Sequence, residues 1–312
     1  MSVLQATNLT KVYPSPFKGS NIKAVDSLTL EVGEGTVFGL LGGNGAGKTT
    51  LIKLILSIIK PTSGTFTLFE QPGNRHDLRA RIGYLPENHR IPPFLTAKEF
   101  LYYFGSLSGI DPAYIKTKIE ETLSLVGLSL QRDKKVKTFS KGMQQRLCLA
   151  QAVIHNPDLI FLDEPTDGID PVGRKEIRDF LLELKNQGKT IFLNSHILSE
   201  VELICDSVAI INKGVLVKKG LVSDLTANYD EYVIKTGNDL REVNYSGFAS
   251  GFNVILKNNS ELVLQKSELE ELNRLIDEMR KQNILIKEIS PIRKTLEEIY
   301  ITTLGENEGA KN

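Results

Sequence analysis

A glycine-rich run at residues 42–50 constrains this chain more than any other feature. It reads Gly-Gly-Asn-Gly-Ala-Gly-Lys-Thr-Thr and follows an apolar segment at residues 36–41. Helical spacing of apolar residues continues after it, and the side chains expected to be buried there are Leu51, Ile52, Leu54, Ile55 and Ile58. The order of strand, loop and buried helix predicts a phosphate-binding loop, because glycines let successive N–H groups turn toward an anion and the helix N-terminus adds its positive dipole end.

The polar side chains of this run fit a nucleoside triphosphate. Lys48 stands where an ammonium would reach the β- and γ-phosphates, and Thr49 stands where a hydroxyl would bind Mg²⁺. The alternative is an ordinary glycine-rich corner between a strand and a helix, which the positions of Lys and Thr disfavour. The predicted nucleotide contacts of the loop are Gly42, Gly43, Asn44, Gly45, Ala46, Gly47, Lys48, Thr49 and Thr50.

Composition narrows the classes of partner. The 312 residues are 41% hydrophobic, enough for one sizeable core and a smaller second one. The formal net charge is zero and no polybasic tract occurs, so nucleic acid is not predicted as a partner.

Cys148 and Cys205 lack metal-ligand spacing and fit a reducing, cytoplasmic compartment. The N-terminus does not resemble a signal peptide, and apolar runs such as residues 54–59 are far shorter than the roughly 20 residues that span a bilayer. We therefore expect any membrane role to depend on a partner.

The pattern along residues 1–225 predicts an α/β fold with a largely parallel, two-sided buried sheet. Residues 3–9 and 28–32 are expected to form an antiparallel leaf beside the phosphate loop. Helices are expected within 95–130, with a break at Asp111-Pro112, and from an N-cap at Ser140 to Asn156. The remaining expected elements are strands at 65–69, 81–86, 159–162, 190–193 and 207–212 and a helix at 173–186.

The character of the sequence changes near residue 225. Short strands are expected at 232–235, 253–257, 261–265 and 284–289. Ser267 and Glu270 form a predicted capping box that would open an amphipathic helix, and a short helix is expected at 295–304. We therefore divide the chain into a domain at 1–225 and a small accessory α+β domain at 226–312.

A second chemical feature is the acidic pair at the end of the strand expected at 159–162. Asp163 and Glu164 would lie at the carboxyl end of a buried strand, where open α/β sheets bind their ligands. Asp163 would hold Mg²⁺ through water, and Glu164 would act as a general base toward the attacking water. His196 follows the next strand and is placed to sense a γ-phosphate. In isolation these features would be a solvated strand end and a surface histidine.

Taken in order and spacing, the motifs resemble the ATP-binding subunit of an ABC transporter. They are the phosphate loop, Phe-Ser-Lys-Gly-Met-Gln at 139–144, the acidic strand end at 160–165, Asp-Gly-Ile-Asp at 167–170, and His196. The resemblance covers residues 1 to about 225, and P-loop kinases and GTPases do not share this motif set. It implies an ABC-type P-loop ATPase fold with a mixed sheet core, an antiparallel β subdomain and a helical subdomain at about residues 88–155.

The resemblance also implies roles for residues outside the loop. Tyr13 would stack on the adenine of ATP. Ser140 and Gly142 would contact the γ-phosphate of ATP bound to the other subunit of a head-to-tail dimer. Asp170 would link the two sites across that interface. Because ATP is sandwiched between two subunits in this family, a dimer with a second copy or a paralogous ATPase subunit is expected to be required for hydrolysis.

Two departures from the family pattern stand out. The usual Leu-Ser-Gly-Gly-Gln is here Phe-Ser-Lys-Gly-Met at 139–143, which keeps Ser140 and Gly142. Glu87 replaces the usual glutamine, and it is predicted to join Thr49 and Asp163 near Mg²⁺. The alternative is that Glu87 points to solvent or toward the membrane partner. Both departures, and a C-terminal extension, resemble the branch that serves exporters with separate membrane subunits.

The sequence therefore predicts ATP binding and hydrolysis that power substrate export through separate integral-membrane permease subunits, at the cytoplasmic face of the cell membrane. The main alternative is a soluble ABC-type ATPase that acts on ribosomes or nucleic acid, but such relatives usually carry two cassettes or a long coiled coil. A purely regulatory nucleotide-binding module is disfavoured by Glu164 and His196. The transported substrate is set by the membrane subunit and not by this fold.

Overall fold

The computed structural model describes residues 1–14, 21–109, 111–241, 249, 251–265 and 268–309. The chain separates into two compact units, one of Met1–Val222 with Thr302–Asn312 and one of Ser223–Ile301. All the residues predicted to form the nucleotide site belong to the first unit.

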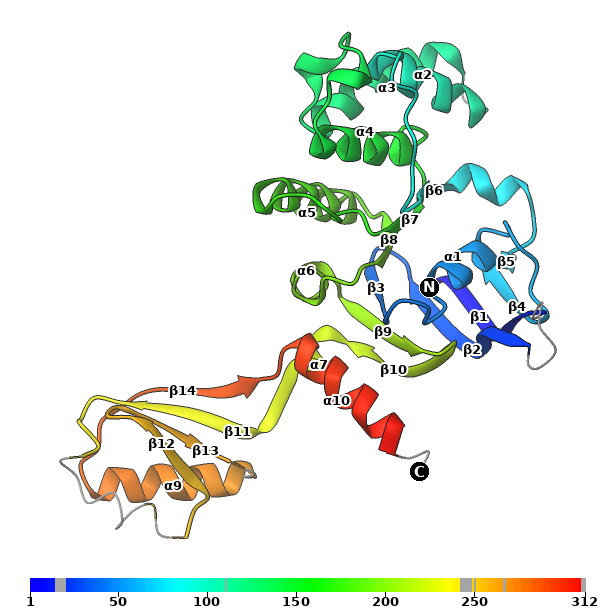
Figure 1. Cartoon of the computed structure of the whole chain (residues 1–312). Coiled ribbons are helices and arrows are strands. Elements are labelled where there is room, and N and C mark those ends of the chain that lie inside the picture. The colour runs from blue at the N-terminus through cyan, green and yellow to red at the C-terminus, as the bar shows by residue number, and fades with distance from the viewer. Residues whose placement is uncertain (15–20, 110, 242–248, 250, 266–267, 310–312) are drawn as a thin grey trace. The chain divides into compact units, whose positions relative to one another are not determined.

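A six-stranded mixed sheet forms the centre of the first unit (Figure 1). The strand order is β10-β9-β3-β8-β7-β6, in which β6 to β9 and β3 run parallel and β10 is antiparallel. The strands are β3 (Val37–Leu41), β6 (Ile82–Leu85), β7 (Leu159–Asp163), β8 (Thr190–Asn194), β9 (Ser207–Asn212) and β10 (Val215–Leu221). Every residue of β3, β7 and β8 is buried, as predicted for parallel strands covered on both faces. Strand β10 was not predicted.

A four-stranded antiparallel sheet lies in the same unit and confirms the predicted leaf. Its order is β2-β1-β4-β5, with β1 (Ser2–Tyr13), β2 (Ile22–Gly33), β4 (Ser63–Leu68) and β5 (Gln71–Pro72). Apolar side chains of this sheet share one core with helix α1 (Lys48–Ile55) and one face of the central sheet. The helix that begins at the phosphate loop is therefore held between two sheets.

Helix α1 ends earlier than the sequence pattern predicted. Leu56 is its C-cap, and Ser57 takes a left-handed conformation with φ 53°. Ile58 therefore leaves the helical register and is 56% exposed, so its predicted burial is wrong. The other four apolar residues of the pattern are buried in the core.

Three helices form the predicted helical region between β6 and β7, namely α2 (Ala97–Leu107), α3 (Pro112–Leu125) and α4 (Lys141–Val153). Thr96 and Glu99 close a capping box at α2, and Asp111 caps α3 ahead of Pro112. The Ser140 hydroxyl accepts from the Met143 N–H at 3.2 Å, which confirms the predicted N-cap of α4. Short 3₁₀ turns η2 (Ser129–Gln131) and η3 (Val136–Thr138) connect α3 to α4, and a further turn, η1 (Asp77–Arg81), precedes β6.

Two further helices of the first unit follow β7 and β8. Helix α5 (Pro171–Asn186) buries one apolar face and begins at Asp170, whose carboxylate accepts from the Gly173 N–H at 2.8 Å. Helix α6 (Leu198–Ile204) is short and was not predicted. Both are crossovers between parallel strands, so the carboxyl ends of β7, β8 and β3 share one edge of the sheet.

The second unit is a small α+β fold. Its antiparallel sheet has the order β12-β13-β11-β14. One helix packs apolar residues against the sheet in a separate core, and Ile234, Leu262 and Leu275 are at its centre. Its strands and main helix are β11 (Ala227–Thr236), β12 (Val254–Asn258), β13 (Glu261–Leu264), α9 (Leu269–Lys281) and β14 (Ile286–Arg293). Helices α7 (Val222–Thr226) and α10 (Leu296–Gly309) cross the unit boundaries, because Val222 and the residues from Thr302 onward belong to the first unit. Ser267 of the predicted capping box lies outside the described residues, and α9 begins after Glu268, which makes no side-chain cap bond.

Across the described ranges, no helix combines the length and apolar composition needed to cross a lipid bilayer.

Candidate nucleotide site

The phosphate loop connects β3 to α1, and close backbone packing explains two of its glycines. Gly47 has φ 105°, and a Cβ there would lie 2.1 Å from the Ala24 carbonyl oxygen. A Cβ on Gly42 would lie 2.6 Å from the carbonyl oxygen of Ile211 on β9. The Gly214 N–H also donates to the Ala46 carbonyl at 2.9 Å. The predicted order of strand, loop and helix is therefore confirmed. The backbone at Ala24 on one side and at Ile211 and Gly214 on the other holds the loop in place.

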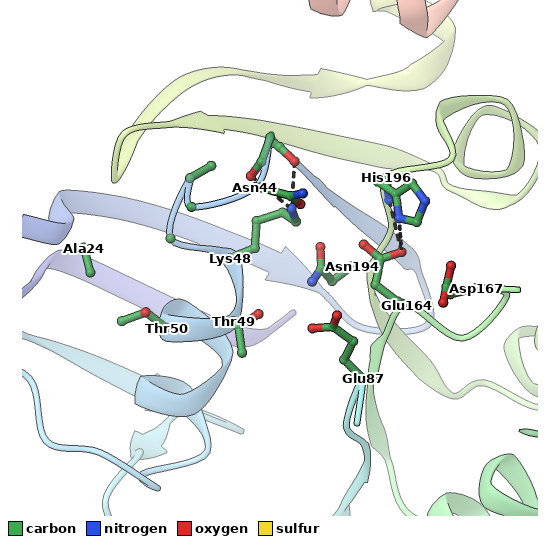
Figure 2. Close-up of a pocket in the computed structure, with 15 residues that line it drawn as sticks. Ala24, Asn44, Lys48, Thr49, Thr50, Glu87, Glu164, Asp167, Asn194 and His196 are labelled. Atoms are coloured by element: carbon green, nitrogen blue, oxygen red, sulfur yellow. Dashed lines mark hydrogen bonds and ion pairs between the residues drawn. The ribbon is translucent and has the colours of Figure 1, made fainter. Parts of the chain in front are cut away.

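Lys48 is the cation of the loop. Its side chain is only 8% exposed, and Nζ donates to the carbonyl oxygens of Gly42 at 2.7 Å and Gly43 at 3.3 Å (Figure 2). Burial of an ammonium requires such partners. The carbonyl contacts hold the charge at the loop, where the sequence predicts a triphosphate.

A cavity of about 600 Å³ opens over the loop, a size suited to a nucleotide. All nine predicted loop residues line it, together with the predicted residues Glu87, Glu164 and His196. Ala24, Asp167 and Asn194 also line it and had no predicted role. Asn194 could have been found from its position, because it is a polar residue at the carboxyl end of a buried apolar strand.

Asp163 lies at the carboxyl end of β7 and is 1% exposed. Its Oδ1 accepts a hydrogen bond from Nδ2 of Asn194, while its Oδ2 has no hydrogen-bond partner among the described residues. Burial raises the pKa of the Asp163 carboxyl, and the charge of Glu87 adds to the rise. The Asn194 hydrogen bond, the charge of Lys48 and the nearby Thr49 hydroxyl oppose the rise. The net effect of these groups is an Asp163 pKa above its ordinary value.

The oxygens at this point fit Mg²⁺. The free Oδ2 of Asp163 and the Thr49 hydroxyl are hard oxygen donors, and Mg²⁺ in nucleotide sites takes one or two protein oxygens while water and phosphate complete the shell. Among the residues that the structure describes, no three His, Cys, Asp or Glu side chains gather as a metal cage. The site therefore has the donors of a shared metal–nucleotide site rather than of a closed protein cage.

Glu164 has a left-handed backbone conformation, and its carboxylate is held by contacts with His196. Its φ is 53°, in the left-handed region that residues with a Cβ rarely adopt. Its side chain is 11% exposed, and Oε2 accepts from the His196 backbone N–H at 3.2 Å and lies 2.8 Å from His196 Nδ1 (Figure 2). Burial raises the pKa of Glu164, and His196 partly opposes this by its charge and hydrogen bonds.

Besides the buried Asp163, four predicted residues do not line the cavity of this chain. Tyr13 ends β1 and is 37% exposed, with Lys11 Nζ 5.2 Å from its ring centroid. The residues after it, 15–20, lie outside the described part of the chain. Ser140 and Gly142 lie at the start of α4, and Asp170 lies at the start of α5. Their predicted roles involve adenine or a second subunit and stay predictions.

A phosphate loop beside a buried acidic pair, at the carboxyl edge of a parallel sheet, defines a P-loop nucleoside triphosphatase. The sequence profile described as ABC transporter matches residues 25–167. The chain belongs to the ATP-binding proteins of the ABC transporter family. It is therefore an ATP-hydrolysing subunit of an ATP-driven transporter.

Relatives and solved structures agree with this assignment. A bacitracin transport ATP-binding protein of Bacillus licheniformis is 43% identical over 70% of this chain and 69% of its own. An ABC transporter ATP-binding protein of Bacillus subtilis is 36% identical over 98% of this chain and 97% of its own. A solved ATP-binding subunit of an ABC transporter matches with a TM-score of 0.62 and 28% identity, covering 72% of this chain and 91% of its own. None of these relatives is named for ribosomes or nucleic acid, so the alternative function gains no support.

Proposed function

We propose that this chain hydrolyses Mg²⁺-bound ATP within a head-to-tail dimer and so drives export through separate integral-membrane permease subunits. The observation that carries the catalytic part is the Glu164 carboxylate, which lines the same cavity as Lys48 and is held by His196. A base and a phosphate cradle in one cavity are the elements that hydrolysis of a triphosphate needs.

The chemistry follows from the positions of these groups. Loop N–H groups and Lys48 hold the β- and γ-phosphates of ATP. Glu164 takes a proton from water as the water oxygen bonds to the γ-phosphorus and the bond to the β-phosphate oxygen breaks, which gives ADP and phosphate. A pKa raised by burial makes the Glu164 carboxylate a stronger base. His196 orients that carboxylate through its N–H groups. In this proposal His196 also senses the γ-phosphate.

Thr49 and Asp163 would hold the Mg²⁺ ion, with Glu87 as the third oxygen donor of the proposal. When bound, the ion neutralises charge on the phosphate oxygens. Two observations support this assignment. Oδ2 of Asp163 is buried and has no hydrogen-bond partner in the part of the chain that the structure describes, and the charge of Glu87 acts on Asp163. Asn194 keeps Asp163 oriented.

The dimer is proposed because part of the family motif set lies outside the cavity. Ser140 and Asp170 are exposed at the starts of α4 and α5, and Gly142 is half-buried beside Ser140. A second copy or a paralogous ATPase subunit would place its ATP against Ser140 and Gly142, with Asp170 at the interface. Tyr13 would stack on adenine.

Export is proposed from the relatives and from the family branch. Proteins named for bacitracin transport are 43% identical in Bacillus licheniformis and 33% identical in Enterococcus faecalis, the latter over 97% of this chain. The proposal places the chain at the cytoplasmic face of the cell membrane, bound to its permease.

The Glu164→Gln variant tests the catalytic part. It keeps the shape and the acceptor oxygen but removes the base, so ATP binding should persist, hydrolysis should stop, and ATP should trap a dimer visible by light scattering. Glu183→Gln, at an exposed position on α5, is the matched control and should behave as wild type. Hydrolysis at the wild-type rate, or no ATP-dependent dimer, would show that the assignment of Glu164 is wrong.

Reconstitution tests the transport part. The chain is co-expressed with the membrane protein from the neighbouring reading frame, and the purified complex is placed in liposomes. We expect co-purification and an ATPase rate that a transported substrate stimulates. A chain that purifies alone, with an ATPase rate insensitive to the membrane protein, would contradict the proposal.

A further inference from the structure

The backbone at Glu164 needs an explanation beyond its own sequence. Its φ of 53° is unfavourable for a residue with a Cβ, and such a conformation persists only where the surroundings hold it. The following residue, Pro165, has a fixed φ and no N–H, so it cannot anchor the bend by donating a hydrogen bond. The interactions that hold the backbone of Glu164 in its left-handed conformation are therefore sought in other helices and strands.

Two hydrogen bonds flank the bend. Before it, the Glu164 N–H donates to the Asn194 carbonyl on β8 at 2.9 Å. After it, the Pro165 carbonyl accepts from Nε2 of Gln145 at 2.8 Å. The second bond is buried and comes from α4, a helix that begins 24 residues before Pro165 in the sequence. The bend is therefore clamped between the central sheet and the helical region.

Gln145 is itself placed for this contact. Its side chain is 5% exposed, on the buried side of a helix whose other buried side chains are mainly apolar. A buried amide is unfavourable without a partner, and the partner here is the carbonyl next to Glu164. A weaker second link runs from the first turn of the same helix, where Lys141 Nζ lies 3.8 Å from the Asp167 carboxylate.

We propose that Gln145 is a positioning residue for ATP hydrolysis, whose side-chain amide holds the Pro165 carbonyl and so keeps the Glu164 carboxylate aimed into the nucleotide cavity beside His196. The inference rests on the proposed function, in which Glu164 is the base. It also connects α4, which carries Ser140 and Gly142 at its start, to the base of the same chain through one buried hydrogen bond.

The test compares two neighbouring glutamines. Gln145→Met keeps length and apolar packing but removes the donor. Gln144→Met is the matched control, because Gln144 Nε2 donates at 3.1 Å to the Phe139 carbonyl within its own segment. We expect Gln145→Met to lower kcat about ten- to a hundredfold, since small misplacements of a catalytic group have effects of this size, with the KM for ATP within about twofold of wild type. Gln144→Met should keep both constants within about twofold.

A general packing defect would raise the KM of Gln145→Met, or it would lower the kcat of both variants to the same extent. Either result would overturn the proposal. So would a Gln145→Met enzyme with the wild-type kcat. If Gln145→Met does not fold, Gln145→Glu at pH 8 decides, because its carboxylate has the same shape but cannot donate. The same loss of kcat is expected there, and an unchanged kcat would refute the proposed role.

Hydrogen exchange separates this proposal from the assignment of the base. Amides of residues 163–169 should exchange faster in Gln145→Met than in Gln144→Met, whatever the chemistry of Glu164. Unchanged exchange would contradict the clamp. If Glu164→Gln, measured in parallel, hydrolyses ATP at the wild-type rate, the base assignment fails while the exchange result still tests Gln145.

Discussion

Asn194 and Asp163 form a buried pair at the carboxyl edge of the central sheet. They are register partners on neighbouring parallel strands, and Nδ2 of Asn194 donates to Oδ1 of Asp163. Each residue is 1% exposed, and each keeps one buried oxygen that no other described residue bonds. The pair therefore presents two oriented oxygens next to the nucleotide cavity. The free energy of the hydrogen bond between Asn194 and Asp163 depends on the charge of Asp163.

Asn194→Leu should destabilise the fold, and more so at higher pH. The pKa of Asp163 is raised in the folded protein by burial, so its contribution to stability is present at low pH and is lost as pH rises through the folded-state pKa. Asn194 lowers that pKa, and removing it raises the pKa further. We expect a loss of about 1–3 kcal/mol in urea unfolding at pH 8 and a smaller loss at pH 5. Asn212→Leu, at the end of β9, is the control. An equal loss at both pH values would contradict this account.

His196→Ala should move the acid limb of the kcat–pH profile to higher pH. Glu164 must be ionised to act as a base, its pKa is raised by burial, and His196 lowers it. Without the imidazole, the Glu164 pKa rises and hydrolysis is lost at a higher pH than in wild type. His76→Ala, at an exposed position, serves as the control. If kcat falls at every pH but the acid limb of the kcat–pH profile stays where it is, His196 does not lower the pKa of Glu164.

Lys48→Met should weaken ATP binding about 10- to 100-fold and abolish turnover, because hydrogen bonds to charged groups contribute about 1.5–3 kcal/mol. Lys53→Met is the matched control, since Lys53 lies on the same helix but is exposed. Binding is measured with a fluorescent ATP analogue. Wild-type affinity in Lys48→Met would remove this lysine from the phosphate site.

Glu87 should govern the Mg²⁺ dependence of hydrolysis. Its charge raises the pKa of Asp163, as expected when carboxylates share a site, and bound Mg²⁺ would favour the ionised forms. We expect Glu87→Gln to retain hydrolysis with an altered Mg²⁺ titration and Glu87→Ala to lose most of the rate. Identical titrations for wild type and both variants would select the alternative, in which Glu87 faces solvent or the membrane partner.

Deleting residues 226–312 should leave ATP binding intact. All the residues that line the nucleotide cavity precede this segment. A lower melting temperature is expected, because residues 302–309 belong to the first compact unit. We expect the deleted part to tune dimerisation or regulation, which light scattering and ATPase assays of both forms would show. A folded truncation that no longer binds ATP would refute the proposed division at residue 225.

The sequence by itself determined the parts of the site that lie within short segments. Glycine conformational freedom and the position of Lys48 identify the phosphate loop within nine residues, and Asp163 and Glu164 follow a continuous apolar run. Local rules also placed the N-cap of α4 and the break at Asp111-Pro112, because an N-cap depends on residues about three positions apart, whereas α4 ends at Val153, before the expected Asn156. The burial expected for Ile58 failed, since a left-handed residue ended the helix first.

Only the tertiary structure decided which side chains control the acidic pair. Asn194 is 31 residues from Asp163, and Gln145 is 20 residues from Pro165, so neither contact appears in a local pattern. Strand register brings the first pair together, and packing of α4 onto the segment after β7 brings the second. Hydrogen bonds from distant elements also flank the left-handed turn at Glu164, a conformation that residues with a Cβ rarely adopt.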